Sequence, residues 1–365
     1  MKFFKKKLDI IQINFEKFWK KTQKSKLPKE LIDITDKFII SDSYKNVSKY
    51  WHSLNIKNYN QLIELGINNY ATNIALNYYT FLHFDNHLIR NTFQNVRNKK
   101  INYKLDLFKK HHLLDYDQSY KYNALLVLLY ENLKKLKEYK LLKLLNDKTF
   151  CGFNDPFLKV EGIKITHDKI NSLLEYNSIK KIPNFSKKNN IIIELGAGSG
   201  RIADVILTLN KKFKYVICDI PLAIFISYCR LKKSFPKKKI LLCDNISNKN
   251  EMIDALAKND ILFIFPHQIK LFEKKTFDIF LAIDCLHEMD KKTIKEYMQQ
   301  VNEYSKCLYF TVWDKTKVPF SMIKNELSVY KDSDYSINKN WKKIFKKKSI
   351  FPSNFIQVCY KIKNL

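Results

Sequence analysis

The chain has 365 residues, of which 45% are hydrophobic and 14% aromatic; this composition excludes a disordered or low-complexity protein and suits two domains. No stretch approaches the roughly 18 consecutive apolar residues that a membrane-spanning helix requires, so we expect no transmembrane segment. Seven cysteines without a C-x-x-C pair favour neither a disulfide framework nor a zinc site. We therefore expect a reducing, cytoplasmic setting and no metal.

The formal net charge of +30 suggests a nucleic acid or an anionic membrane surface as a partner. However, only four of the 66 basic residues are arginines, and arginine is the side chain that phosphate and base recognition favour. Abundant lysine together with Asn, Ile, Tyr and Phe is typical of a chain encoded by an AT-rich genome. We therefore expect a solvated lysine surface, and the lysine runs keep a polyanionic partner as the weaker alternative.

Residues 1–150 are expected to form a helical domain, because apolar residues recur there at helical spacing and strand signals are nearly absent. The clearest periodic segments are 8–18, 70–84 and 122–145. This domain could cap the part that follows, or it could assemble the chain into a homo-oligomer. His83, Asp85 and His87 lie close together in the sequence but lack a clear third metal ligand.

The turn-rich segment 151–156 marks a boundary, after which a helix is expected from His167 to about Ser178. Residues 151–365 then alternate short apolar runs with helical stretches, which is typical of an α/β sheet with helices on both faces. The expected strands are Ile191–Leu195, Tyr215–Cys218, Ile240–Cys243, Ile261–Phe265, Phe277–Ile283, Leu308–Trp313 and Phe355–Ile362.

The most specific pattern is the segment Glu194–Arg201, where three of the chain's six glycines, Gly196, Gly198 and Gly200, fall within five positions. An apolar run precedes the segment and a helical pattern follows it, so we expect a tight strand-to-helix turn. Glycine permits positive φ and a close approach of the backbone to a ligand, while the helix N-terminus presents free N–H groups. Asp219, at the end of the next strand, is placed to accept hydrogen bonds from a ribose diol.

The position of Glu194 favours a cationic cofactor. A carboxylate directly before the turn would repel a pyrophosphate, and the G-x-G-x-G spacing departs from the G-x-G-x-x-G of dinucleotide-binding folds. The ammonium and sulfonium groups of S-adenosylmethionine would be attracted instead. We therefore predict an S-adenosyl-L-methionine site, formed by Glu194, Gly196, Ala197, Gly198, Gly200, Asp219 and Ile220.

The string E-L-G-A-G-S-G-R resembles motif I of the class I S-adenosylmethionine-dependent methyltransferases, and Asp219 matches their ribose-binding acid. Over residues 150–315 the chain resembles the sugar O-methyltransferase family of bacterial surface-polysaccharide clusters. The resemblance implies a Rossmann-like sheet preceded by a helical domain, and methyl transfer to a sugar or glycan hydroxyl, nucleotide-linked or lipid-linked. The matching strings are Asp155-Pro156, Gly162, Asn171–Tyr176, Glu194–Arg201, Cys218–Pro221, Phe265–Gln268 and Phe277–Met289.

The end of the expected fourth strand would carry the chemistry, because ligands of open α/β sheets bind beyond the carboxyl ends of the strands. Asp284, His287 and Glu288 follow this strand. A hydroxyl is a poor nucleophile until it loses its proton, and histidine is the natural general base near neutral pH. We predict His287 as the base and Asp284 or Glu288 as the group that orients it, although Glu288 could instead cap the next helix. Cys285 and His287 depart from the family, where Ser and Gln are expected.

Two further cofactor contacts are expected. Gln268 follows one strand and could hydrogen-bond the adenine, but Asp244 follows another, and the sequence does not decide which strand lies third in the sheet. Ser172 shares a helical face with Glu175, and the resemblance places this helix over the cofactor.

Two other functions are open alternatives: a nucleic-acid methyltransferase and a non-catalytic cofactor-binding or assembly module. The positive charge supports the first, but residues 284–287 lack the Asn/Asp-Pro-Pro-aromatic motif typical of base methylation. The intact glycines and Asp219 speak against the second.

Overall fold

The computed structural model describes residues 15–45, 47, 49–79, 109–111, 114–145, 156–313, 316–317, 329–330, 332–350 and 355–363. Part of the helical pattern expected over 8–18 and 70–84 lies outside these residues, as do His83, Asp85 and His87. Among the described residues, no helix combines the length and the apolar character needed to cross a bilayer.

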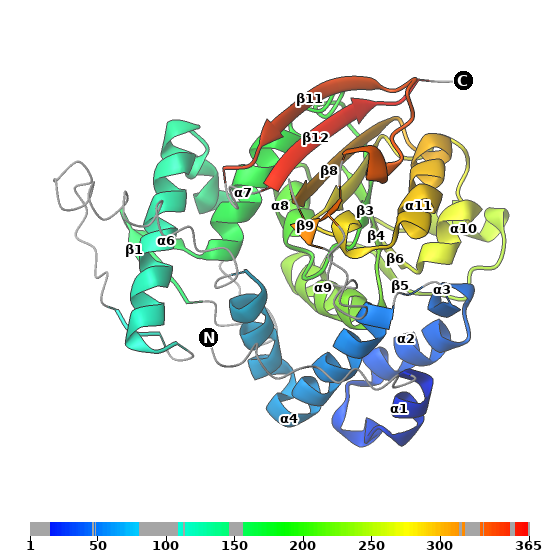
Figure 1. Cartoon of the computed structure of the whole chain (residues 1–365), viewed down its shortest axis with the longest axis horizontal. Helices are drawn as coiled ribbons and strands as arrows, with labels where there is room; N and C mark the ends of the chain where they lie inside the picture. The colour runs from blue at the N-terminus through cyan, green and yellow to red at the C-terminus, as the bar shows by residue number, and fades with distance from the viewer. Residues whose placement is uncertain are drawn as a thin grey trace.

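An eight-stranded sheet forms the centre of the chain (Figure 1). β8, β7, β3, β4, β6 and β5 run parallel, whereas β12 is antiparallel to both β8 and β11. This is the Rossmann-like sheet expected from the sequence. In spatial order the strands are β11 (Lys342–Lys348), β12 (Phe355–Lys361), β8 (Cys307–Trp313), β7 (Ile279–Ile283), β3 (Ile191–Leu195), β4 (Lys214–Cys218), β6 (Ile261–Ile264) and β5 (Ile240–Leu242).

Helices cover both faces of the sheet, which explains why its parallel strands are continuous apolar runs. Successive side chains of a strand point to opposite faces, so Ile192 belongs to one buried cluster and Ile193 to the other. The first face is covered by α7 (His167–Ile179), α8 (Arg201–Leu209) and α9 (Pro221–Ser234), and the second by α10 (Lys249–Lys258) and α11 (Lys291–Tyr304).

The helical N-terminal part shares the core of the first face. α2 packs against α9, and α6 packs against α7. Phe38 of α2 contacts Phe265, with ring centroids 5.3 Å apart. The α-helices of this part are α1 (Phe15–Lys21), α2 (Lys29–Ile39), α3 (Asp42–Lys45), α4 (Lys49–Tyr79, kinked at Gly66) and α6 (Tyr116–Lys135). The short 3-10 helices of the chain are η1 (Lys24–Lys26), η2 (Tyr139–Leu144), η3 (Pro266–Leu271), η4 (Leu286–Glu288) and η6 (Asp332–Tyr335).

The structure contains strands that the sequence patterns did not indicate. β1 (Leu158–Val160) and β2 (Ile163–Ile165) form a short hairpin around Gly162, and β9 (Thr316–Lys317) pairs with β10 (Val329–Tyr330). β11 reads KKIFKKK and was missed because an exposed edge strand needs no apolar run. The helix expected over 122–145 is α6 and η2, with a break after Lys135.

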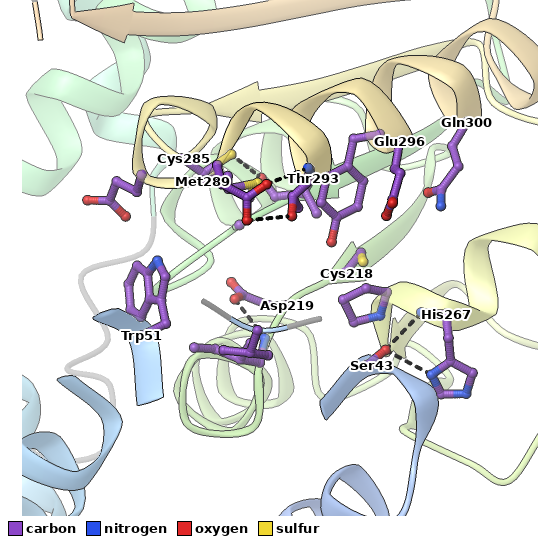
Figure 2. A pocket seen from close by; sticks show the side chains of 18 residues that line it. Ser43, Trp51, Cys218, Asp219, His267, Cys285, Met289, Thr293, Glu296 and Gln300 are labelled. Carbon is purple, nitrogen blue, oxygen red and sulfur yellow. Dashed lines mark hydrogen bonds between the residues drawn. The ribbon is translucent and has the colours of Figure 1, made fainter. Parts of the chain in front are cut away.

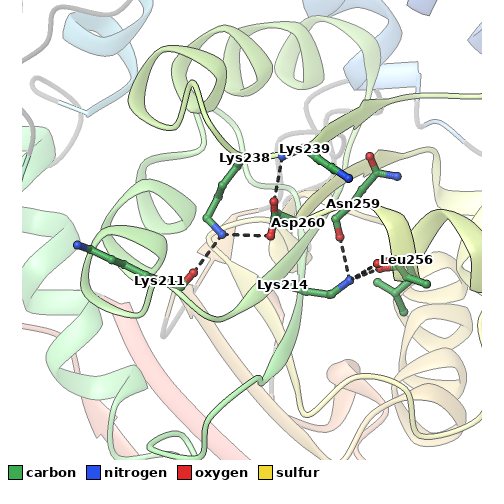
Figure 3. Close-up of polar contacts among 8 residues, drawn as sticks. Lys211, Lys214, Lys238, Lys239, Leu256, Asn259 and Asp260 are labelled. Carbon is green, nitrogen blue, oxygen red and sulfur yellow. Dashed lines mark hydrogen bonds and ion pairs between the residues drawn. The ribbon is translucent and has the colours of Figure 1, made fainter.

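Polar contacts stabilise the amino ends of β4 and β6, where α10 leads into β6 (Figure 3). The Lys214 ammonium group donates to the carbonyl oxygens of Leu256, Ala257 and Asn259, which the end of α10 leaves without helical partners. Asp260 accepts from the backbone N–H of Lys239 at 2.9 Å. These bonds hold β6 in register with β4 and β5, so their carboxyl ends lie at one edge.

Candidate functional site

A cavity opens at the carboxyl ends of β3, β4, β6 and β7, with α11 on one side and the N-terminal helices on the other (Figure 2). Its enclosed volume is about 150 Å³. The sheet side is formed by Gly196, Cys218, Asp219, Ile220, Cys285 and Glu288, and the opposite walls include Ser43, Trp51, Thr293, Glu296, Tyr297 and Gln300.

The glycine turn after β3 has the backbone that the sequence predicts. Gly196, Gly198 and Gly200 all have positive φ, between 56° and 70°. A Cβ atom on Gly196 would lie 2.6 Å from the Cβ of Cys285, and one on Gly200 would lie 2.8 Å from the Cβ of Ser227. Glycine is therefore required at both positions, at the first to admit the β7 loop and at the second to let α9 approach α8.

Asp219 lies at the end of β4 and lines the cavity. Its two carboxylate oxygens accept hydrogen bonds from the backbone N–H groups of Gly198, at 2.9 Å, and Ile220, at 2.8 Å. Burial raises the pKa of Asp219 to about 6, and these two bonds offset part of the increase. The carboxylate is thus fixed against the glycine turn, with lone pairs left for a ligand.

Glu194 lies within β3 beneath the glycine turn, is 2% exposed and does not line the cavity. Its carboxylate accepts a hydrogen bond of 2.7 Å from the hydroxyl of Tyr215. Burial raises the pKa of Glu194 to about 7, despite the opposing effects of the Tyr215 bond and the Arg201 charge. Ala197, Gly198 and Gly200 likewise lie outside the cavity lining.

Arg201, the first residue of α8, is a buried cation shared by several carboxylates. Burial raises the pKa of Glu175, Glu194 and Asp284, and the Arg201 charge partly offsets the increase at each. Its guanidinium lies 3.3 Å from the hydroxyl of Ser172, which itself donates to the carbonyl of residue 168. Ser172 therefore holds Arg201 and is not part of the cavity lining. Arg201 belongs to the predicted motif, but sequence reasoning assigned it no role.

Asp284 and His287 lie together beyond β7. The Nε2 atom of His287 is 3.4 Å from Oδ1 of Asp284, and the imidazole is buried between Trp313 and Phe355. Asp284 has a φ of 60°, and its backbone N–H donates to the Thr311 carbonyl at 3.0 Å. Its side chain stays 32% exposed, while burial raises its pKa to about 8. Neither side chain lines the cavity of Figure 2.

Glu288 lines the cavity and does not cap the following helix, contrary to the alternative drawn from the sequence. Asp290 caps α11, because its carboxylate accepts from the backbone N–H of Thr293 at 2.8 Å. The sequence reasoning started this helix at the right place but considered the wrong carboxylate.

Gln268 is 2% exposed and does not reach the cavity. Its amide accepts from the backbone N–H of Phe265 at 3.0 Å and donates to the carbonyls of Asp244 and Ile246. These bonds engage the amide inside the protein, where it ties the loops after β5 and β6 together. β6 lies beside β4 with β5 outside it, so the loop after β6 borders the cavity through Pro266 and His267.

The N-terminal helices supply one wall of the cavity, through residues that the sequence analysis did not name. The Ser43 hydroxyl bonds Nδ1 of His267 and accepts from its backbone N–H, both at 2.9 Å, and Trp51 faces the cavity near Asp219 (Figure 2). Ser43 and His267 are 224 positions apart, and no local pattern predicts such a contact.

The described lining is acidic, which suits a cationic ligand. Four of its residues are carboxylic acids and none is lysine or arginine. The acids are Asp219, Glu288, Asp290 and Glu296.

No protein-family model matches the chain, and no curated protein matches it. The solved structures to which the chain shows some similarity include methyltransferases. An O-methyltransferase family 2 protein of Planctomyces limnophilus is 11% identical, with a TM-score of 0.35 over 50% of this chain and 54% of that one. Magnesium protoporphyrin IX methyltransferase of Synechocystis is 8% identical, with a TM-score of 0.38 over 65% and 99%. The fibrillarin pre-rRNA processing protein of Methanococcus jannaschii is 10% identical, with a TM-score of 0.36 over 58% and 84%.

The chain spans about half the length of the first of these structures. These similarities do not extend to what those proteins bind or act on.

Proposed function

We propose that the chain is an S-adenosylmethionine-dependent O-methyltransferase whose acceptor is a sugar hydroxyl. The observation that carries the proposal is the junction of the glycine turn after β3 with Asp219 after β4, beside an acidic cavity. Ligands of open α/β folds bind at the carboxyl ends of the strands, and this is where the junction lies.

The residues present fit S-adenosylmethionine. Asp219 would hold the ribose hydroxyls, Gly196 would allow the amino-acid part to approach the backbone, and Ile220 and Trp51 would border the adenine. The acidic lining suits the ammonium and sulfonium charges. Glu194 does not line the cavity and would attract these charges from its buried position beneath the glycine turn. When bound, the cofactor supplies a methyl group activated by the positive sulfur.

The chain's own contribution is to align the acceptor and to take up its proton. We assign the uptake of the acceptor hydroxyl's proton to the Asp284–His287 pair, which lies directly beyond β7, next to the cavity-lining Cys285. Asp284 is the more exposed member of the pair and would accept the proton. The buried His287 would orient its carboxylate. A pKa of about 8 at Asp284 suits a base that works near neutral pH.

The sugar as acceptor rests on the resemblance over residues 150–315, and the first experiment tests the cofactor separately from it. The purified chain is titrated calorimetrically with S-adenosylmethionine and with S-adenosylhomocysteine, with Asp219→Ala as the matched variant. Micromolar binding that Asp219→Ala weakens about 10- to 100-fold, through lost hydrogen bonds, supports the site. Equal binding by the wild type and the variant would show that the cofactor binds elsewhere. Binding by neither protein would contradict the proposed activity.

The acceptor is then identified by transfer of a labelled methyl group to sugars, nucleotide sugars and glycans, with RNA and DNA in parallel. Label on a nucleic acid alone would replace the sugar proposal with the nucleic-acid alternative.

A further inference from the structure

A second cleft lies at the end of the sheet opposite the first cavity, where β7, β8 and β11 begin and β12 ends. Its volume is about 1410 Å³, which exceeds the roughly 300–1,000 Å³ typical of small-molecule sites. Its walls come from five separate stretches of the chain, among them α11 and the start of β11. The cleft therefore suits a ligand that extends beyond it.

Lysine dominates the lining of this cleft. Seven lining residues are lysines, and one, Glu303, is acidic. The lysines are Lys274, Lys275, Lys295, Lys306, Lys342, Lys361 and Lys363.

Most of these charges have no acidic partner among the described residues. Glu303 lies 3.6 Å from Lys274, and Asp278 lies 2.8 Å from Lys306. No described carboxylate lies within salt-bridge distance of four others, Lys295, Lys342, Lys361 and Lys363. The cleft thus has several positive charges available to a partner.

Two of the lysines repel each other directly. Lys342 of β11 and Lys361 of β12 are register partners in the antiparallel pair, and like charges at opposed positions destabilise a sheet. Lysines on β11 are explained by protection of an exposed edge strand. That explanation does not cover Lys361, because β12 is an interior strand between β11 and β8. An anion bound between the two ammonium groups would remove their repulsion.

The other lining groups indicate which anion. Asn184, Gln299, Asn302, Ser336 and Asn338 add amide and hydroxyl groups that can hydrogen-bond hydroxyls and acidic groups. The described lining contains no aromatic side chain, although single-stranded nucleic acids are usually held by stacking on aromatic rings. We propose that this cleft binds an extended anionic glycan, recognised by the lysine charges together with the amide and hydroxyl groups. The inference goes beyond the proposed methyl transfer and does not depend on it.

The test measures binding of a fluorescently labelled heparin octasaccharide by anisotropy, in parallel with a labelled oligouridylate of similar charge. The variant carries Lys295→Glu, Lys342→Glu and Lys361→Glu. The matched control carries Lys212→Glu, Lys237→Glu and Lys249→Glu, three exposed lysines outside both cavities, so both proteins have the same net charge. A Lys→Gln set at the first three positions serves if the Glu set does not fold.

We expect the cleft variant to bind the octasaccharide at least 10-fold more weakly at about 50 mM salt, with a log–log salt slope smaller by about 2–3. The control should lose no more than about threefold, through the general field. Thermal unfolding and S-adenosylhomocysteine binding at the opposite edge report whether the fold is intact. Equal losses in both variants would overturn the cleft as a site, as would failure of the octasaccharide to bind. Tighter binding of oligouridylate through the same lysines would overturn the glycan in favour of RNA.

Discussion

Replacing Gly200 with alanine would test how closely α8 and α9 must approach each other at the glycine turn. The residue has a φ of 70°, and its new Cβ would lie 2.8 Å from the Cβ of Ser227 and 3.3 Å from its Cα. The left-handed backbone costs about 1–2 kcal/mol for a non-glycine residue, and overpacking adds about 1–3 kcal/mol. We expect Gly200→Ala to lower the free energy of unfolding by about 2–5 kcal/mol.

Gly162 provides the matched control, because it has a φ of 75° and nothing lies within 4 Å of its Cβ position. Gly162→Ala should cost only the backbone part, about 1–2 kcal/mol. Urea unfolding followed by circular dichroism measures both variants, together with Ser227→Gly alone and combined with Gly200→Ala. A favourable coupling of about 1 kcal/mol or more between positions 200 and 227 is expected for residues in contact. Equal destabilisation by the two alanines and no coupling would refute the close approach of the helices.

Four further predictions concern Glu194, Asp219 and the Asp284–His287 pair. Glu194→Gln keeps an acceptor for Tyr215 and removes a carboxyl whose pKa burial raises from 4.5 to about 7. The folded protein binds this proton more tightly than the unfolded chain does. The free energy of unfolding of the wild type should therefore fall by about 3 kcal/mol as pH rises from about 4.5 to 7, and that of the variant should not. Parallel pH profiles of the two proteins in urea unfolding would contradict this. Turnover should rise as pH increases through about 8, where Asp284 loses its proton, and a pH–rate profile of Asp284→Asn should lack this step. His287→Ala should lower turnover by roughly 10²–10⁴-fold while calorimetry shows unchanged cofactor affinity, and near-normal turnover would remove His287 from the chemistry. Asp219 should bind ribose less well below pH 6 as its carboxylate is protonated, so the dissociation constant of S-adenosylhomocysteine should increase there.

The parallel core of the fold could be predicted because burial on both faces leaves a local record in the sequence. The apolar run Ile191–Leu195 indicates a buried strand, and the glycines directly after it indicate a tight turn. β11 leaves no such record, since five of its seven residues are lysines at an exposed edge.

The candidate site was predictable where its residues lie beyond the carboxyl ends of expected strands. Gly196 and Asp219 follow from a turn and a strand end, whereas Ser43 and Trp51 reach the cavity through tertiary packing that no spacing encodes. Gln268 looked like a ligand because amides bind adenine well, but backbone groups of neighbouring loops compete for the same amide.

Because Ser43 and Trp51 form one wall of the cavity, the shape of the cavity mouth and the geometry of the glycine turn depend on different parts of the chain. The glycine turn and Asp219 belong to the sheet, while this wall comes from a stretch more than 140 positions earlier in the chain. Substitutions in residues 43–51 can therefore change the width and polarity of the cavity mouth while the turn keeps its geometry. New specificities could arise in the helical half by small steps, each of which leaves the strand ends intact.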